Sequence, residues 1–276
     1  MAVKGEGVPE TWYSYLVWGV FCFTLFKYSN STLSPAKSPA FNTLAPPTVL
    51  PDDPCMSVGH DFTLAGAQLA ALGSGALWWA KQRLLCVSDL HLGKSERIIR
   101  RGGSALPPYE TRDTLARLEA DLEHHPAQTV ICLGDSFDDL DAARALPEQE
   151  RLWIARLQAG RRWIWVEGNH DPGPIDVGGS HLDEVSIDAL TFRHIADPSC
   201  NGEVSGHYHP KASLSMRGRT VSRSAFLYDS ERLIMPAFGT YTGGLRSTSD
   251  TLARLMLPGS IAVLTGPRPT AIPMPR

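Results

Sequence analysis

The chain has 276 residues, a formal net charge of −3 and a hydrophobic fraction of 43%. The hydrophobic fraction excludes a wholly disordered chain, and the slight acidity excludes a generally basic nucleic-acid coat while leaving room for a local basic groove. Its five cysteines are scattered and form no Cys-x-x-Cys pair, so neither a disulfide framework nor a structural zinc site is indicated. This cysteine pattern favours a reducing, cytoplasmic compartment.

The first 55 residues differ in composition from the rest of the chain. Residues 12–26 form an apolar run that is shorter than the roughly 20 residues a spanning helix needs. Residues 28–54 contain six prolines, which predicts a flexible linker. We weigh a membrane anchor, an export signal and an upstream stretch attached by an early start codon. We favour the third, because Met56 begins a self-sufficient globular pattern that predicts a folded domain over residues 56–276.

From Met56 onward, apolar runs suited to buried strands alternate with helical patterns. The first strands are predicted at residues 76–80, 84–88, 128–133 and 162–166, and the helices at residues 111–125 and 147–159. Later strands are predicted at residues 203–205, 220–228, 232–238 and 261–265. Strand–helix alternation followed by strands is typical of an α/β domain with packed sheets.

Four polar motifs each begin where an apolar strand run stops. They are D-L-H at residues 89–91, G-D-S-F-D-D at 134–139, G-N-H-D at 168–171 and G-H-Y-H at 206–209. Because sites in α/β sheets form at the carboxyl ends of strands, we expect the four motifs to converge. The glycine before Asp135, Asn169 and His207 is expected to let the backbone turn sharply after each strand.

The side chains of these motifs indicate a metal centre. Asp, His and Asn without a thiolate suit divalent ions such as Mn, Fe or Zn. Asp89 and His91 are two residues apart and share a face at a strand end, and His207 and His209 repeat that spacing. Two such pairs supply more ligands than one ion needs, which indicates two metals. Any one motif alone is more often a polar turn, but the ordered set of four outweighs that interpretation.

Together the motifs resemble the pattern of the calcineurin-like metallophosphoesterase family, D-x-H, G-D-x-x-D, G-N-H-D/E, H and G-H-x-H, over most of residues 84–210. The resemblance implies a four-layer α/β/β/α sandwich and two divalent ions, with Mn²⁺ expected first and Fe, Zn or Mg as alternatives. It also implies that the isolated His194 is a ligand. The implied ligands of the first metal are Asp89, His91, Asp135 and His209, and those of the second are Asp135, Asn169, His194 and His207.

The same resemblance implies that His170 faces the substrate without binding metal and that Asp138 supports a ligand from behind. Two nearby ions would lower the pKa of a shared water and offset the charge that builds on a phosphoryl group. His170 could donate a proton to the leaving oxygen, and we expect Asp171 to orient or charge its imidazole. For Asp139 we expect only a solvated turn carboxylate.

A narrower resemblance covers nearly the whole chain from Met56 onward. The stretches DLHLGKSERIIRRGG (89–103), CLGDSFDD (132–139) and LIMPAFGTYTGGL (233–245) resemble the PdeM-type branch of the family. Members of that branch are grouped with a DNA ligase, a helicase and an exonuclease in a proposed DNA damage response. The resemblance implies a DNA endonuclease with a possible functional association with those enzymes.

Two basic clusters flank the motifs that carry the predicted ligands. Lys94, Arg97, Arg100 and Arg101 follow the first motif, and Lys211, Arg217, Arg219 and Arg223 follow the last. Any single residue among them is more often an ordinary surface charge, but two clusters at one mouth predict a polyanion groove. In residues 238–244 we expect a pliable loop whose Tyr241 stacks on a base, with core packing weighed equally for Phe238. The candidate substrate-binding residues are Lys94, Arg97, Arg217, Arg219 and Tyr241.

Three functions compete on this sequence. The first is a phosphodiesterase acting on nucleic acid, with DNA preferred over RNA. The second is a phosphohydrolase of a small nucleotide or pyrophosphate, for which an apolar cleft without the arginines would have been typical. The third is a non-catalytic scaffold on the same fold, which ranks last because every predicted ligand and the histidine of G-N-H-D are intact.

Overall fold

The computed structural model describes residues 59–104, 106–216 and 218–276. The chain divides into two units between Pro51 and Asp52, and every described residue belongs to the second unit. The predicted apolar run, the predicted linker and Arg217 lie outside the described residues. In the described part of the chain, no helix is both long enough and apolar enough to span a bilayer.

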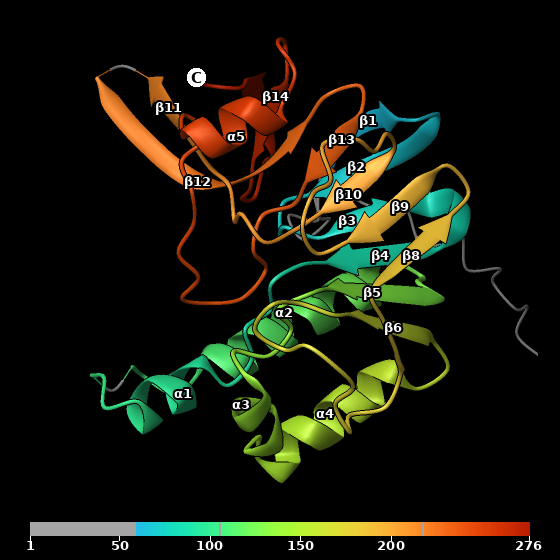
Figure 1. The fold of residues 1–276 in the computed structure, drawn as a ribbon, viewed down its shortest axis with the longest axis vertical. Coiled ribbons are helices and arrows are strands. Elements are labelled where there is room, and N and C mark those ends of the chain that lie inside the picture. The colour runs from blue at the N-terminus through green and yellow to red at the C-terminus, as the bar shows by residue number, and fades with distance from the viewer. Residues whose placement is uncertain (1–58, 105, 217) are drawn as a thin grey trace, which may run out of the picture. The chain divides into compact units, whose positions relative to one another are not determined.

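A seven-stranded sheet is built in chain order from the first strands of the domain (Figure 1). Its strands are β1 (Gly59–Leu64), β2 (Ala67–Leu72), β3 (Leu77–Trp79), β4 (Leu84–Val87), β5 (Thr129–Leu133), β6 (Arg162–Val166) and β7 (Ser180–Leu182). Pairing is antiparallel from β1 to β4 and parallel from β4 to β7. The parallel strands β4 and β5 are apolar on both faces because packed layers cover both.

A second sheet of eight strands contains the other strands of the described residues. Its order is β15-β14-β12-β13-β10-β9-β8, and β11 pairs with β12 beside this path. The strands are β8 (Glu184–Ile187), β9 (Leu190–Arg193), β10 (Glu203–Ser205), β11 (Lys211–Met216), β12 (Arg219–Tyr228), β13 (Arg232–Ile234), β14 (Ile261–Leu264) and β15 (Thr270–Pro273). The strands β9, β10 and β13 are parallel to one another.

Three clusters of buried side chains separate four layers. The cluster between the sheets includes Phe62, Ile131, Phe192 and Phe226. A second cluster packs α2 (Glu110–His124) and α4 (Glu148–Gln158) against the outer face of the first sheet, and a third packs α5 (Asp250–Leu255) against the second sheet. The helices therefore lie outside the two sheets, as Figure 1 shows. The expected four-layer α/β/β/α sandwich is confirmed.

The predicted elements coincide with observed ones, with one clear difference. The strand predicted over residues 232–238 ends at Ile234. Pro236 has no N–H to give a ladder, and the N–H groups of Phe238 and Gly239 instead bond to the carbonyls of Ser88 and Asp89. The chain thus leaves the second sheet and passes behind the first motif. The prediction missed the β1–β2 hairpin, β7 to β9, β11, β15 and the short helices α1 (Lys94–Arg100), α3 (Leu140–Arg144) and α5.

Candidate metal centre

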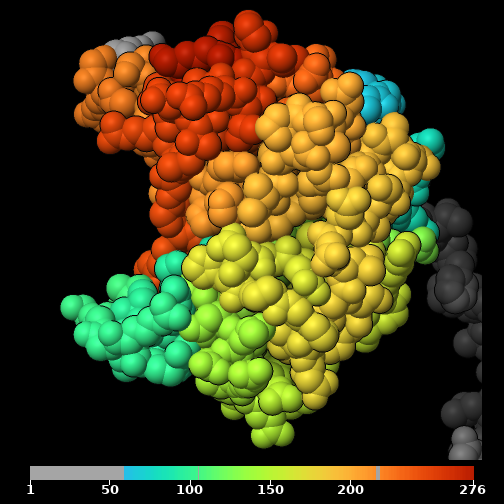
Figure 2. Space-filling view, in the orientation of Figure 1, coloured from blue at the N-terminus to red at the C-terminus, as the bar shows by residue number. Residues whose placement is uncertain are grey.

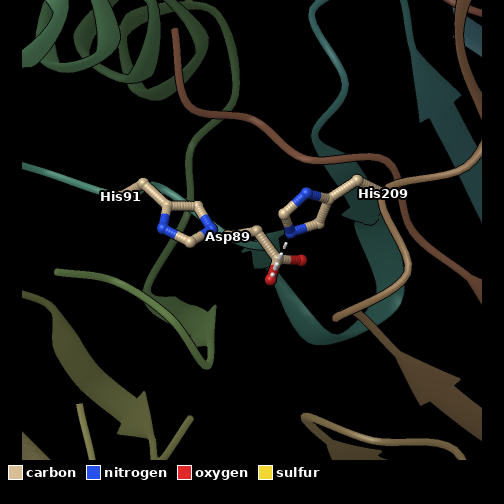
Figure 3. A group of neighbouring side chains, drawn as sticks. All are labelled: Asp89, His91 and His209. Carbon is tan, nitrogen blue, oxygen red and sulfur yellow. Dashed lines mark ion pairs between the residues drawn. The ribbon is translucent and has the colours of Figure 1, made fainter. Parts of the chain in front are cut away.

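The first group of predicted ligands comes from loops that follow β4 and β10. Asp89, His91 and His209 offer ligand atoms that all lie within 4.8 Å of one another. Figure 3 shows Asp89 between the two imidazole rings. The His209 Nε2 lies 3.0 Å from the Asp89 Oδ1. The Nε2 atoms of His91 and His209 are buried, and neither has a hydrogen-bond partner among the described residues.

The other nitrogen of His91 is occupied, which fixes the direction of the ring. Its Nδ1 lies 2.8 Å from the Oδ1 of Asp138, a carboxylate that is fully buried. A carboxylate behind a histidine is the usual arrangement that aims the second nitrogen at a metal. Asp138 therefore holds the His91 ring through Nδ1, and its role as the support of a metal ligand stays a prediction.

The second group comes from β5, β6, β9 and β10 and adjoins the first. Asp135, His194 and His207 offer ligand atoms within 4.8 Å of one another. The Nε2 of His194 lies 3.3 Å from the Asp135 Oδ2, 3.0 Å from the Asn169 Oδ1 and 3.3 Å from the His207 Nδ1. The two groups approach where the His194 Nδ1 lies 3.9 Å from the Asp89 Oδ1.

This donor set fits divalent cations. Two buried imidazole nitrogens without partners need an acceptor of their lone pairs, and a cation between them and Asp89 supplies it. Asp135 lies in the second group, and its Oδ1 accepts a hydrogen bond from the N–H of His170 at 2.8 Å. Its role as a bridge between two ions stays a prediction.

The charges of the second group are set by its own contacts. Burial acts to raise the pKa of Asp135, but the hydrogen bond and charge of His194 and the N–H of His170 outweigh it and lower that pKa to about 2. Burial and the neighbouring His194 lower the pKa of His207. These shifts favour an ionised Asp135 carboxylate and a neutral His207 imidazole, the states in which both groups bind metals. Burial acts to lower the pKa of His194, but its hydrogen bond to Asp135 and the charges of Asp89 and Asp135 outweigh it and raise that pKa, so His194 releases a proton when it binds a metal.

The backbone of the predicted ligands is held in an uncommon conformation. Of nine non-glycine residues with positive φ in the described part of the chain, five are predicted ligands. These five are Asp89, His91, Asp135, His207 and His209, with φ between 45° and 69°. A left-handed residue costs on the order of 1 kcal/mol, so the surrounding packing imposes this geometry.

The glycines of the motifs act in two ways. Gly134 has a φ of 73°, as a sharp turn after β5 requires. Gly168 and Gly206 are absent from the positive-φ residues, so the expected turn is not their reason. A Cβ on Gly168 would lie 2.1 Å from the backbone N of Asp135, and a Cβ on Gly206 would lie 2.0 Å from the Ser88 Oγ. These two glycines let the ligand loops touch.

His170 lies at the edge of the first group. Its ring meets that of His91 edge to face at a centroid distance of 5.2 Å. Its Nδ1 lies 2.9 Å from the carbonyl oxygen of Asp138 and therefore donates to it, which leaves Nε2 directed elsewhere, 4.0 Å from the Asp135 Oδ2. The side chain keeps 31% of its surface exposed, so Nε2 can reach a substrate.

Asp171 does not touch the imidazole as the sequence led us to expect. Its carboxylate accepts hydrogen bonds from the N–H groups of Ser136, Phe137 and Gly168. Burial, aided by the charge of Asp135, raises the pKa of Asp171 to about 7 despite those bonds. The carbonyl of Asp138 orients His170, and Asp171 ties the second motif to the third.

The candidate substrate residues occupy different surroundings. Lys94 and Arg97 bind the carboxylate of Asp138 at 3.2 Å and 2.8 Å. Asp139, expected to be a solvated turn residue, instead caps α3 by accepting from the N–H of Ala142 and pairs with Arg100. Arg219 is exposed on β12.

Tyr241 has an aromatic neighbour that the sequence did not reveal. Its φ is 64°, and its ring centroid lies 5.5 Å from that of Tyr109, which is 52% exposed. Tyr109 precedes Tyr241 by more than a hundred residues in the sequence, so no local pattern signals the contact. The ring of Phe238 is buried beneath the Arg117 guanidinium, which confirms the core interpretation of that residue.

Comparisons with known proteins agree with this geometry. A solved structure of the Pseudomonas putida nuclease MPE is similar to this chain, with a TM-score of 0.61 and 28% sequence identity over 77% of this chain and 100% of that one. The search of curated proteins gives no match. The model of the calcineurin-like phosphoesterase family matches residues 82–227, which is over half of the chain and includes every predicted ligand. The chain therefore belongs to the calcineurin-like phosphoesterase family of metal-dependent hydrolases.

Proposed function

We propose that this protein is a dinuclear-metal phosphodiesterase that cleaves nucleic acid, and specifically a DNA endonuclease. The observation that carries the proposal is the pair of adjoining ligand groups, the first around Asp89 and the second around Asp135. The similarity to a nuclease along most of the chain supports a nucleic-acid substrate.

The residues of each group have separate duties in this proposal. Asp89, His91 and His209 would hold one cation, and Asn169, His194 and His207 would hold the other, with Asp135 assigned by the resemblance as a ligand of both. Such cations supply Lewis acidity and a nucleophilic water at neutral pH. We assign the metal as Mn²⁺, with Fe, Zn and Mg as alternatives, because the donors are imidazoles, carboxylates and one carboxamide.

His170 serves as the proton donor to the leaving oxygen. Its Nδ1 is fixed by the Asp138 carbonyl, so the proton that moves is the one on Nε2. The Asp135 Oδ2 lies 4.0 Å from that Nε2. Asp171 contributes by holding the loop that carries His170 against Ser136 and Phe137.

The wider setting of the activity rests on the resemblance in residues 89–103 and 233–245. It supports a role in a ligase-associated DNA repair system, together with a DNA ligase, a helicase and an exonuclease. The free cysteines Cys86, Cys132 and Cys200 of the described residues fit a cytoplasmic location.

An assay with Mn²⁺ and three substrates tests the proposal. We expect hydrolysis of bis-p-nitrophenyl phosphate and of single-stranded DNA, with less activity on p-nitrophenyl phosphate. Activity on the monoester alone would favour a phosphohydrolase of small nucleotides or pyrophosphate, and no activity on any of the three would favour a scaffold.

Two variants separate metal binding from proton transfer. His170→Ala should keep its metal content and lose about 10²- to 10⁴-fold in kcat, as expected for loss of a general acid. Asp135→Ala should lose both ions, because the resemblance assigns its carboxylate as the ligand that the two ions share. An unchanged kcat in the first variant removes His170 from the mechanism, and full metal occupancy in the second contradicts the bridge.

A further inference from the structure

Strands β11 and β12 form a two-stranded ribbon (residues 211–228). The ribbon extends past the edge of the second sheet, and the last ligand motif lies at that same edge. β12 pairs with β13 only at Leu227 and Tyr228, opposite Ile234 and Leu233. Residues of β12 before Leu227 therefore project beyond the carboxyl end of β13. β10 runs parallel to β13 and ends at Ser205, just before His207 and His209, so the ribbon projects on the side of the metal centre.

The two faces of the ribbon have different compositions. Alternation places Ala212, Leu214, Ala225 and Leu227 on the face that packs in the cluster beneath α5. Phe226 lies on the opposite face, between the two sheets. In the projecting part, the residues on the side of Phe226 are Lys211 and five hydroxylic residues. We call these five the hydroxyl face: Ser213, Ser215, Thr220, Ser222 and Ser224.

The contacts of these hydroxyls confirm that they share one side. Ser213 lies directly opposite Ser222, and Ser215 lies opposite Thr220. The Ser215 and Thr220 side-chain oxygens are 2.9 Å apart. Ser213, Ser215, Thr220 and Ser222 are exposed, so no layer of the described structure covers this face.

The hydroxyl face begins at the metal centre. Lys211 lies on the same side of the ribbon as the hydroxyl face, two residues after His209. Its Nζ lies 3.4 Å from the carbonyl oxygen of Thr242. Thr242 belongs to the loop in which Gly244 approaches His209 closely enough that a Cβ would lie 2.0 Å from the His209 carbonyl oxygen. Figure 2 shows the surface hollowed between the ribbon and the segment that contains α1.

The charge of the ribbon matches a polyanion. Residues 211–228 contain four basic residues and no carboxylate, in a chain whose net charge is −3. Among the described residues Lys211 is the basic residue on the side of the hydroxyl face, whereas Arg219 and Arg223 lie on the opposite face and make no ion pair with any described residue. Hydroxyls and lysines are the side chains that bind phosphate and sugar oxygens without reading sequence.

We propose that the hydroxyl face binds the sugar–phosphate backbone of a nucleic-acid strand on its path away from the metal centre. The inference rests on the proposed function for the identity of the substrate and adds a second contact region beyond the reacting phosphate. A second copy of this chain suits the face less well, because symmetric pairing of two ribbons would bring their cations together. The binding is independent of base sequence, since no base edge is contacted.

Equilibrium binding of a labelled oligodeoxythymidylate to the full chain tests the proposal. The dissociation constant is measured by fluorescence anisotropy without added metal, so that the oligonucleotide binds but is not cleaved. Ser222→Asp places a carboxylate on the hydroxyl face and should raise Kd about tenfold. Val221→Asp adds the same charge one residue away on the opposite, exposed face, and should change Kd less than about twofold. Ser222→Thr keeps the hydroxyl and should bind as the unmodified chain does.

Substrate length provides the control for the chemistry. Turnover of bis-p-nitrophenyl phosphate with Mn²⁺ should be equal in all three variants, because that substrate is too short to reach the ribbon. If the unmodified chain hydrolyses nothing, the proposed function fails while the Kd values still report on the ribbon. Equal Kd increases in Ser222→Asp and Val221→Asp, or none in Ser222→Asp, overturn the inference. A change in sedimentation alone would assign the face to a second copy.

Discussion

The two basic segments beside the metal centre have similar compositions and opposite electrostatic surroundings. In the α1 segment (residues 94–101), Lys94 and Arg97 bind Asp138, and Arg100 and Arg101 bind Asp139. In the ribbon, Arg219 and Arg223 have no carboxylate partner among the described residues. The number of lysines and arginines in a segment therefore does not predict whether its positive charge is available to a substrate.

The difference follows from what each segment packs against. The α1 segment lies beside Asp138 and Asp139, which end the second motif, and beside Asp141 in α3. The ribbon projects beyond its sheet, where none of the described residues forms an ion pair with Arg219 or Arg223. We infer that the α1 segment supports the metal ligands through Asp138 and that the ribbon contacts the substrate.

Asp138→Ala should have the largest effect on this comparison. It removes the partner of the His91 Nδ1 and leaves Lys94 and Arg97 without their shared carboxylate. Loss of such a support typically lowers metal affinity 10- to 100-fold, and we expect a decrease of about that size. Metal titration by calorimetry measures it. Asp141→Ala, an exposed carboxylate on the same segment, is the control, and equal affinities in both variants would contradict the supporting role.

Lys211→Ala should have the next largest effect, seen in the salt dependence of oligonucleotide binding. A cation that contacts one phosphate contributes about 0.7 to the slope of log K against log salt for a single strand. We expect the slope to fall by about that amount in Lys211→Ala. Arg100→Ala should leave the slope nearly unchanged, since Glu96, Asp139 and Asp141 all pair with that guanidinium. Equal slopes for the two variants would remove the distinction between the segments.

The sequence predicted the metal ligands well and the surroundings of the basic segments poorly. The four motifs located six of the seven predicted ligands because each motif follows a buried strand, and strand ends are local signals. The seventh, the isolated His194, was assigned only by the family resemblance. The neutralisation of Arg97 and Arg100 was not predictable, because it depends on carboxylates about 40 residues away in a different loop. The contact of Tyr109 with Tyr241 and the backbone role of Asp171 were missed for the same reason.

The fold shows a similar division. The buried strands β4 and β5 and the helix α2 have continuous apolar runs or clear helical spacing, and were predicted within one or two residues. The strand β11, with sequence KASLSM, was missed because its alternating residues are serines, alanine and lysine rather than large apolar side chains. That weak pattern is the same property that makes the hydroxyl face.

Asp139→Ala should have a moderate effect, on stability and not on activity. The side chain caps α3 and pairs with Arg100, and loss of a cap costs about 1 kcal/mol. Burial acts to raise the pKa of Asp139, but the hydrogen bonds from Arg100 and the Ala142 N–H lower it below its ordinary value. The stabilisation is therefore present at neutral pH and is lost as the pH falls below about 4. Thermal unfolding of both proteins at pH 7 and pH 3 measures this, and a constant difference in Tm would contradict it.

Arg219→Ala should have the smallest effect, and it completes the contrast with Asp139. Arg219 is exposed near the end of the ribbon and has no ion pair with a described residue, so its removal should change Tm by less than about 2 °C. Arg219 lies on the face opposite the hydroxyl face, so its charge acts only through the long-range field, and oligonucleotide binding should weaken less than about twofold at low salt and recover at high salt. Arg100→Ala should show the reverse, a lower Tm with unchanged binding, because its charge is already neutralised by Asp139. If both variants lowered Tm and binding together, the two segments would share one role.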